Sequence, residues 1–433
     1  MEQWTDTEML LDLQKATFTY FLRHWNPVNG LIPDNTRSDA PCSITAVGLA
    51  LASYPVGVER GYITRAEAVA RTLTTLRFFW SSEQSRALDA TGYQGFYYHF
   101  LEMETGRRSP NAELSTVDST FLLAGMLTAG AYFDMETPEE YEIRELATAL
   151  YHRANWQWAL NGGLLVSHGW TPEASFIPWR WEGYSEALLL YVLALASPTY
   201  PISPASYAAW TESYDWRTLY GYEYLHASPL FIHQISHVWI DFRQIQDAYM
   251  RTKGIDYFEN SRRAAYIQQA YAVENPQQFR AYGELIWGIT ASDGPGDETR
   301  VIDGIERTFY AYRARGIPDG PDDGTISPWA VVASLPFAPE IVVPTIAHVQ
   351  QQYPAMVSEL GFHCSFNPTY IDKSGNGWIA QGYYGLDQGP IVLMIENYLT
   401  GFPWRLMDGC PVISEGLRRA GFAGGWLDSD LST

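Results

Sequence analysis

Aromatic rings and carboxylates gather in residues 167–187, which read SHGWTPEASFIPWRWEGYSEA. Trp and Tyr present flat apolar faces with polar edges, which suit sugar rings, and paired carboxylates are the groups that cleave glycosidic bonds. Carbohydrate chemistry is therefore our first hypothesis for this stretch. An aromatic-rich loop whose acids are simply solvated would have the same composition, because such acids are common on helical surfaces.

Glu182 and Glu186 lie four residues apart within this stretch. If a helix has begun by Trp181, both carboxylates lie on one face of it. Two neighbouring carboxylates raise each other's pKa, and desolvation by the adjacent rings raises it further, which suits a proton donor at neutral pH. The alternatives are a surface pair or a clamp that holds Arg180.

Four further acids lie at expected helix starts or inside a helix. In ELSTVD, Glu113 precedes a helix and Asp118 lies in its first turn, where the helix dipole favours an ionised carboxylate that could serve as a base or a nucleophile. Asp118 could instead only complete a capping box, and Asp387 in GLDQGPIVLMIEN could be an N-cap. Glu396 lies in the apolar part of that last helix, so we expect a partner for its charge.

The segment FIHQISHVWIDFRQIQD spaces His233, His237 and Asp241 at helical intervals of four. That spacing predicts one shared helical face. It also resembles the HxxxH pattern of zinc sites, but the Glu that follows the first His in HExxH is missing, so a metal is disfavoured. Two roles therefore remain possible for these groups and for Arg243: they could donate hydrogen bonds to or accept them from sugar hydroxyls, or they could brace the barrel core.

Neither a cofactor nor a metal is expected elsewhere in the chain. TASDGPGDE and IPDGPDDGT resemble calcium loops, but neither has the full set of oxygen ligands, and Asp beside Gly and Pro is typical of turns. There is no GxSxG motif, no Gly-rich phosphate loop and no dinucleotide fingerprint. Acyl, phosphoryl and hydride transfer are therefore disfavoured.

The composition limits the possible partners. A formal net charge of −21 disfavours binding to nucleic acid or anionic lipid, whereas an aromatic content of 15% favours a cleft that stacks on a neutral ligand. Three widely spaced cysteines predict buried thiols rather than a disulfide framework. No apolar run is long enough to span a membrane, and the N-terminus does not read as a signal peptide, so we expect a cytoplasmic protein, or a periplasmic one if a leader has been removed.

The elements that must position these groups are mostly helices. Capping boxes such as 64–67 and apolar periodicity predict about a dozen, and 95–101 is the best candidate for a strand. Four long loops separate some of the helices, and long loops are usually functional. Without a linker or a change of composition, the pattern favours one domain over residues 1–433, an all-α barrel (toroid of helical hairpins) with long loops forming a cleft at one end. The expected helices include 43–53, 182–196, 232–250, 256–274, 329–334, 340–357, 388–400 and 411–420, and the long loops are 162–181, 214–229, 282–328 and 361–387.

Several long motifs together resemble the bacterial glucoamylase-like proteins of glycoside hydrolase family 144, and the resemblance runs from near Cys42 to Leu427. Among these motifs are GFYYHFLEMETGRR, ELSTVDSTFLLAG, SHGWTPEASFIPWRWEGYSEALLLYVLAL, PLFIHQISHVWIDFR and GLDQGPIVLMIENYLTG. The resemblance implies an (α/α)6 barrel that acts on β-1,2-glucan by inversion, either cleaving within the chain or releasing sophorose from its end. Related barrels in cyclic glucan synthases transglycosylate instead. Glu113, Glu182 and Asp387 match acidic positions of the family.

We therefore expect a metal-independent glycoside hydrolase without cofactors, whose partner is a β-glucan. Glu182 or Glu113 is the expected acid, Asp387 the leading base and Asp118 the reserve. A retaining transglycosylase and a glycan-binding protein without catalysis are the alternatives. The expected substrate-binding residues are His168, Trp170, Trp179, Arg180, Trp181, Tyr184, Glu186, His233, His237, Trp239, Asp241 and Arg243.

Overall fold

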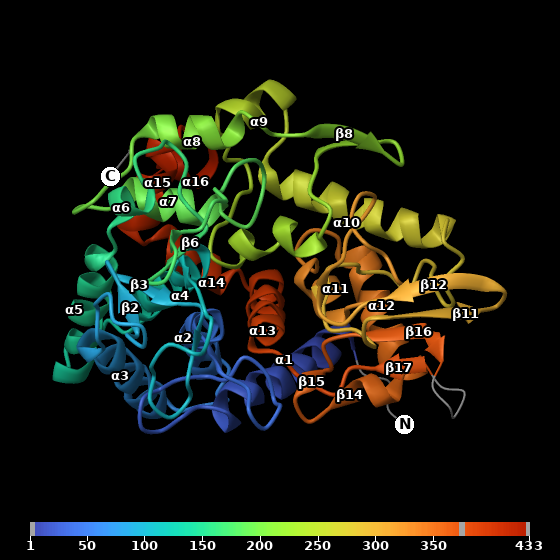
Figure 1. The fold of residues 1–433 in the computed structure, drawn as a ribbon, viewed down its shortest axis with the longest axis horizontal. Helices are drawn as coiled ribbons and strands as arrows, with labels where there is room; N and C mark the ends of the chain where they lie inside the picture. The colour runs from blue at the N-terminus through green and yellow to red at the C-terminus, as the bar shows by residue number, and fades with distance from the viewer. Residues whose placement is uncertain (1–4, 372–376, 430–433) are drawn as a thin grey trace.

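The computed structural model describes residues 5–371 and 377–429. Its helices form an (α/α)6 barrel, in which an inner layer of helical elements alternates along the chain with an outer layer. In Figure 1, the outer helices α3 and α5 lie at the left and α10 and α12 at the right, on either side of the inner helix α13. The inner elements are α2 (Ile44–Glu59), α4 (Thr116–Tyr132), α7 (Leu188–Ala196), the 3-10 turns η1 (Leu230–His233) and η2 (Ile235–Val238), α11 (Pro328–Ala333) and α13 (Gly385–Leu399). The outer helices are α1 (Asp6–Arg23), α3 (Arg65–Ser81), α5 (Pro138–Arg153), α8 (Pro204–Thr211), α10 (Tyr257–Glu274) and α12 (Pro339–Gln352).

Shorter elements complete the helical part of the chain. The helices α6 (Trp156–Ala159), α9 (Ala248–Lys253), α14 (Phe402–Asp408), α15 (Pro411–Arg419) and α16 (Gly425–Ser429) and the 3-10 turn η3 (Pro354–Met356) lie between or after the paired elements. Within the described ranges, no helix is both long enough and apolar enough to cross a membrane. The three cysteines are free and buried, which confirms the prediction made for them.

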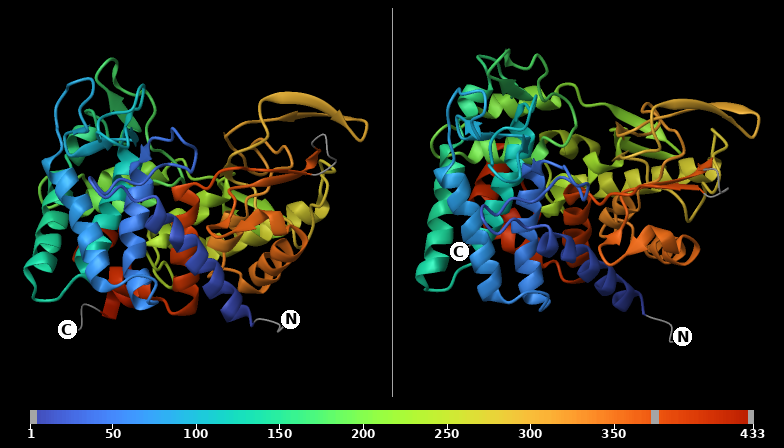
Figure 2. Two further views of the ribbon diagram at one scale, coloured as in Figure 1. Left: turned by 90° about the horizontal axis from the view of Figure 1, so that it is seen from below. Right: turned by 60° about the horizontal axis from the view of Figure 1, so that its bottom comes forward.

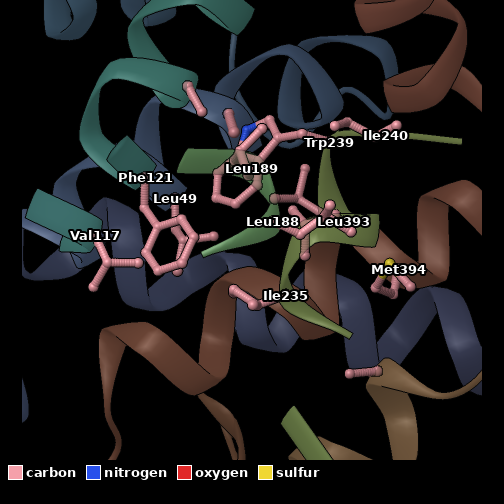
Figure 3. Packing of buried hydrophobic residues seen from close by; sticks show 14 of the residues in the cluster. Leu49, Val117, Phe121, Leu188, Leu189, Ile235, Trp239, Ile240, Leu393 and Met394 are labelled. Atoms are coloured by element: carbon pink, nitrogen blue, oxygen red, sulfur yellow. The ribbon is translucent and has the colours of Figure 1, made fainter. Parts of the chain in front are cut away.

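The inner helices are apolar on all sides because each is enclosed by its neighbours. Every residue of α7 from Leu188 to Leu195 is buried, and α2 contacts both α4 and α13. The α2–α4 crossing depends on glycine: a Cβ on Gly125 would lie 2.0 Å from the carbonyl oxygen of Gly48. Side chains of the inner elements meet in the barrel core, as Figure 3 shows for Leu49, Phe121, Leu188, Ile235, Trp239 and Leu393.

Short antiparallel strands occupy the loops, where the sequence indicated only one strand. The strand predicted at 95–101 is confirmed in part as β3 and β4. Figure 2, left panel, shows the β11–β12 hairpin and other loops at one end of the helices and both termini toward the other. A five-stranded sheet has the order β2 (Gly92–Tyr93), β3 (Phe96–Tyr98), β5 (Leu114–Ser115), β6 (Gly169–Thr171) and β7 (Ser175–Phe176). The two-stranded pairs are β1 (Cys42–Ser43) with β4 (Phe100–Leu101), β8 (Trp216–Leu219) with β9 (Tyr222–Leu225), β10 (Ala291–Ser292) with β13 (Arg313–Ala314), β11 (Glu298–Ile302) with β12 (Ile305–Phe309), β14 (Val357–Ser358) with β15 (Gly361–Phe362), and β16 (Phe366–Ile371) with β17 (Gly377–Ile379).

The helix predicted over 232–250 is wrong. The chain forms η1 and η2 and then an irregular segment before α9. Neighbouring helices take the backbone carbonyls that a continuous helix would use: Ser261 donates to the carbonyl of His233 at 2.6 Å and Trp404 to that of His237 at 2.6 Å. Tertiary hydrogen bonds therefore replace the helical ladder here.

The helix predicted from Glu182 is also shorter than expected, because α7 begins only at Leu188. Gly183 has φ of +71°, a left-handed conformation that interrupts a right-handed helix, and its N–H donates to the carbonyl of Trp210. The prediction that Glu182 and Glu186 share one helical face is therefore wrong.

Candidate active site

A cavity of about 380 Å³ has four carboxyl groups in its lining. Asp118 and Asp387 lie in the first turns of α4 and α13, and Glu186 lies just before α7. Asp34 comes from the loop that precedes β1. The starts of three inner elements thus direct acids to one place, which the alternation of inner and outer helices makes possible. The other lining residues are Asn35, Arg37, Ser43, Thr45, His99, Phe100, Val117, Phe121, Phe231, Ile235, Tyr312, Tyr384 and Leu386.

His99 joins two of the predicted acids. Its Nδ1 lies 2.9 Å from Oε1 of Glu113 and its Nε2 lies 3.6 Å from Oδ1 of Asp118. Burial disfavours the imidazolium, but the charges of Asp118 and Glu113 outweigh it and raise the pKa of His99 to about 9. The ring stacks on Phe100 with centroids 3.9 Å apart. His99 is therefore a fixed cation at neutral pH.

Among the described residues, His99, Glu113 and Asp118 are the one group whose ligand atoms lie close enough together to hold a metal ion. Without a metal ion, the imidazolium of His99 lies between the two carboxylates, so the three residues form an ion-paired acid–histidine–acid cluster.

Asp118 accepts hydrogen bonds from two hydroxyl groups. Thr45 Oγ1 lies 2.6 Å from Oδ1, and Ser115 Oγ lies 2.5 Å from Oδ2. Ser115 also caps α4 by accepting from the backbone N–H of Asp118 at 3.2 Å. With His99 nearby and the helix N-terminus beneath it, this carboxyl is surrounded by hydrogen-bond donors and positive charge.

The carboxyl of Glu186 has a raised pKa. Burial, reinforced by the negative charge of Asp118, raises its pKa to about 7. A carboxyl with that pKa holds its proton over much of the neutral range, so Glu186 can donate a proton to a group bound in the cavity.

Asp387 is buried, and its Oδ2 has no hydrogen-bond partner among the described residues. Burial raises its pKa well above the usual value, and the charges of Asp34 and Asp293 add to this, whereas a hydrogen bond with Cys364 opposes it. Burial also raises the pKa of Asp34. The cavity therefore holds carboxyls with raised pKa values beside Asp118, whose carboxyl is contacted by two hydroxyl groups and lies near His99, an arrangement suited to general acid–base catalysis.

Glu182, the first choice as acid, lies outside this cavity. Its side chain is exposed and lines a separate hollow with Arg180 and Glu212. The clamp on Arg180 that the sequence offered as an alternative does not involve Glu182. The guanidinium of Arg180 instead donates to the backbone carbonyls of Leu160 and Leu165, both at 2.7 Å. Of the acids proposed for catalysis, Asp118 and Asp387 line the cavity, and Glu113 adjoins it through His99.

None of the predicted aromatic platforms lines the cavity. Trp170, Trp181 and Trp239 are buried, whereas Trp179 is 68% exposed. Their rings pack against protein: His168 stacks on Trp181 with centroids 3.7 Å apart, Trp239 stacks on Phe121, and Tyr184 lies against Tyr257 and His233.

His233, His237, Asp241 and Arg243 do not share a helical face, because η1 and η2 replace the predicted helix. Both histidines are buried, and burial lowers the pKa of each to about 3. His233 Nε2 donates to the carbonyl of Ala227 at 3.2 Å, and Asp241 pairs with Arg243 at 2.5 Å. These contacts correspond to the core-bracing alternative.

Sequence reasoning missed Asp34, His99, Arg37, Tyr312 and Tyr384, all of which line the cavity. The predicted strand around GFYYHF could have pointed to His99, a polar residue beside a run of aromatic ones. Asp34 and Arg37 belong to a turn-like PDNTR segment, and Tyr312 lies within the long loop 282–328. Only the tertiary arrangement distinguishes these residues from ordinary turn and loop residues.

Comparisons with known proteins show which proteins the chain as a whole is similar to. A family model described as "Glycoamylase: Putative glucoamylase" matches residues 178–411. The chain is 29% identical over 454 aligned residues to an exo β-1,2-glucooligosaccharide sophorohydrolase (non-reducing end) of Parabacteroides distasonis. That match covers 96% of this chain but only 58% of the relative, so the chain spans less than two thirds of that protein.

Two solved structures resemble the whole chain. A "putative glucoamylase" from Bacteroides uniformis is 30% identical with a TM-score of 0.86, and the match covers 98% of this chain and 100% of the other. An endo-β-1,2-glucanase from Chitinophaga pinensis, in complex with sophorotriose and glucose, is 25% identical with a TM-score of 0.86 and the same coverage of 98% and 100%.

Proposed function

Because the chain belongs to the glucoamylase-like family, glycoside hydrolase family 144, we propose that it hydrolyses β-1,2-glucan with Glu186 as the proton donor. The observation that carries the proposal is the pKa of about 7 at Glu186, in a cavity that also holds Asp118. The relatives named for β-1,2-glucan and its oligosaccharides support the choice of substrate. A net charge of −21 is compatible with a neutral glucan.

In the proposed reaction, Glu186 protonates the glycosidic oxygen as the bond breaks, while a carboxylate removes a proton from the attacking water. We assign that second role to Asp118, since two hydroxyl groups donate to its carboxyl and the cationic His99 lies beside it. Attack of water on the opposite face of the sugar inverts the anomeric carbon. Asp387, with its raised pKa, is better suited to donate a hydrogen bond to a sugar hydroxyl than to act as the base.

The experiment that tests the proposal follows digestion of β-1,2-glucan by NMR, with starch and β-1,3-glucan as competing substrates. We expect turnover of β-1,2-glucan alone and first release of the α-anomer, the product of inversion. First release of the β-anomer would overturn inversion in favour of a retaining reaction. Binding of glucan without any turnover would overturn catalysis, and hydrolysis of starch would overturn the substrate.

We propose cleavage within the chain as the mode of action, supported by the endo-β-1,2-glucanase that matches over the whole length. Release of sophorose from a chain end is the second candidate, because the P. distasonis relative is named for it. Product sizes early in the digestion of a long glucan separate the two. Endo action gives a ladder of oligosaccharides, whereas exo action gives only the disaccharide.

A further inference from the structure

The cavity wall includes one aromatic ring that the core does not enclose. Tyr312 lines the cavity, yet 51% of its surface is exposed. Tyr384, the neighbouring ring of the lining, is 7% exposed. A large ring left half-open in a cavity with carboxyls has a free surface for a ligand, and sugars present apolar faces that stack on such rings.

Tyr312 is carried by the arm 291–314, which leaves and rejoins the barrel through the β10–β13 pair and contains the β11–β12 hairpin. The hairpin projects from the body of the molecule in Figures 1 and 2. Tyr312 lies at the base of this arm, immediately before β13. Its position is therefore set by how the base of the arm is anchored.

A buried ion pair anchors that base. Arg315 and Asp323 have side chains that are 0% exposed, and Arg315 Nε lies 2.8 Å from Oδ1 of Asp323. The guanidinium also donates to the carbonyls of Tyr310 at 2.9 Å and Ala311 at 3.1 Å. Asp323 accepts from the N–H of Tyr310 at 3.1 Å. The backbone just before Tyr312 is thus fixed from both sides.

The anchoring of the arm by Arg315 and Asp323 has a functional explanation. Burying two charges is costly, and apolar residues of similar volume would often stabilise a fold as well, so this pair is better explained by the geometry that it fixes. A ring held in place before the ligand arrives loses little conformational freedom on binding.

The surroundings of Tyr312 place it beside the reacting groups. Its ring centroid lies 6.1 Å from that of Tyr384, and the guanidinium carbon of Arg37 lies 5.9 Å from the Tyr384 ring. Arg37 in turn pairs with Asp293, at 2.5 Å, next to β10 of the same arm.

We propose that Tyr312 is the stacking platform of a glucosyl subsite beside the carboxyl groups, and that the arm 291–314 is the rigid wall that holds it there. This inference rests on the proposed function and adds the residue whose ring stacks on the sugar. Stacking acts on bound substrate and transition state alike, so its loss raises KM and leaves kcat almost unchanged.

The test compares Tyr312→Ala, Tyr312→Phe and Tyr312→Leu, with Tyr141→Ala as the matched control. Tyr141 is 57% exposed on the outer helix α5, so its removal takes away a similar exposed ring from a surface with no role in the proposal. We expect Tyr312→Ala to raise KM for β-1,2-glucan about tenfold, with kcat within about twofold of the parent. Tyr312→Phe keeps the ring and should behave like the parent, and Tyr312→Leu should behave like the Ala variant.

Calorimetric titration of a β-1,2-glucan oligosaccharide into the same variants, each combined with Glu186→Gln, measures binding without turnover. A KM and an affinity for Tyr312→Ala within twofold of the parent would overturn the inference while the proposed function stands. Equal losses in the Phe and Ala variants would overturn stacking in favour of a hydroxyl contact. A parent that neither binds nor cleaves β-1,2-glucan would overturn both proposals together.

Discussion

Two buried carboxyls on one helix, α13, have opposite surroundings. Glu396, 2% exposed near the end of the helix, accepts from Arg60 at 2.7 and 3.0 Å, from Gln14 at 3.0 Å and from Thr400 at 2.7 Å. Asp387, 4% exposed in the first turn, has an Oδ2 without a partner among the described residues. The carboxyl at one end of the helix is thus paired with a cation and several donors, whereas the one at the other end has an oxygen without a hydrogen-bond partner among the described residues.

The difference distinguishes a structural acid from one that we propose to be functional. A carboxylate near a helix C-terminus faces the negative end of the dipole, so Glu396 requires the guanidinium that it has. A buried acid without compensation costs stability, and such a cost is retained where chemistry needs a perturbed group. Asp387 lines the cavity with Glu186 and Asp118, whereas Glu396 does not.

The largest effect on activity is expected for a substitution of the cavity residue Glu186. Glu186→Gln removes the proposed proton donor and should lower kcat about 10²- to 10⁴-fold, because an amide cannot protonate the leaving oxygen. Steady-state kinetics on β-1,2-glucan measure this. The free energy of unfolding should change little or rise, since a neutral side chain suits the buried position.

Glu182→Gln is the matched control, because it makes the same change four residues earlier on an exposed side chain. We expect its kcat to stay within about twofold of the parent, since surface substitutions usually have small effects. If Glu182→Gln loses activity and Glu186→Gln keeps it, the assignment of the acid is reversed.

Substitution of Glu396, at the other end of α13, should lower stability and leave activity unchanged. Glu396→Gln breaks the pair with Arg60 and leaves a charge without its partner, which should lower the free energy of unfolding by about 3 kcal/mol. Urea unfolding measures the loss. At temperatures where the variant is folded, its kcat should equal that of the parent, and a large fall in kcat would show that Glu396 takes part in the reaction.

A pH profile sharpens the distinction further. Glu186 must be protonated to act, and its pKa of about 7 predicts that kcat falls about tenfold for each pH unit above that value. Activity measured between pH 5 and pH 9 gives the position of this limb. A profile that stays flat through pH 7 would contradict the role of Glu186 as the acid.

The sequence predicted the layers of the fold well. Apolar periodicity and capping residues located most of the long helices, and the partner expected for the charge of Glu396 is confirmed as Arg60. The errors arose where tertiary contacts replace local preferences. Gly183 prevents the helix predicted from Glu182 from beginning before Leu188, and the hydrogen bond from Ser261 to His233 helps to interrupt the helix predicted over 232–250.

The site was only partly predictable for the same reason. Asp118 was recognised because a helix start favours an ionised acid, which is a local signal, and Asp387 because it lies at an expected helix start and matches an acidic position of the family. Choosing Glu186 over Glu182 required knowing which of the two turns inward, because their local sequences are equally aromatic. Tyr312 had no local signal at all, since its role depends on an arm anchored by Arg315 far from the catalytic motifs.

The smallest effect concerns the stability cost of Asp387. Its folded pKa lies well above the usual value, so between about pH 4 and that folded pKa the unfolded chain releases a proton that the folded chain keeps, and stability falls as pH rises. Asp387→Asn mimics the protonated group and removes this loss, so it should raise the free energy of unfolding at pH 7 by about 1 kcal/mol. Near pH 3.5 the carboxyl of the parent is mostly protonated in both states, and the two unfolding curves should nearly coincide. A variant less stable than the parent at pH 7 would mean that the carboxylate of Asp387 is compensated, like that of Glu396, and the contrast between the two ends of α13 would fail.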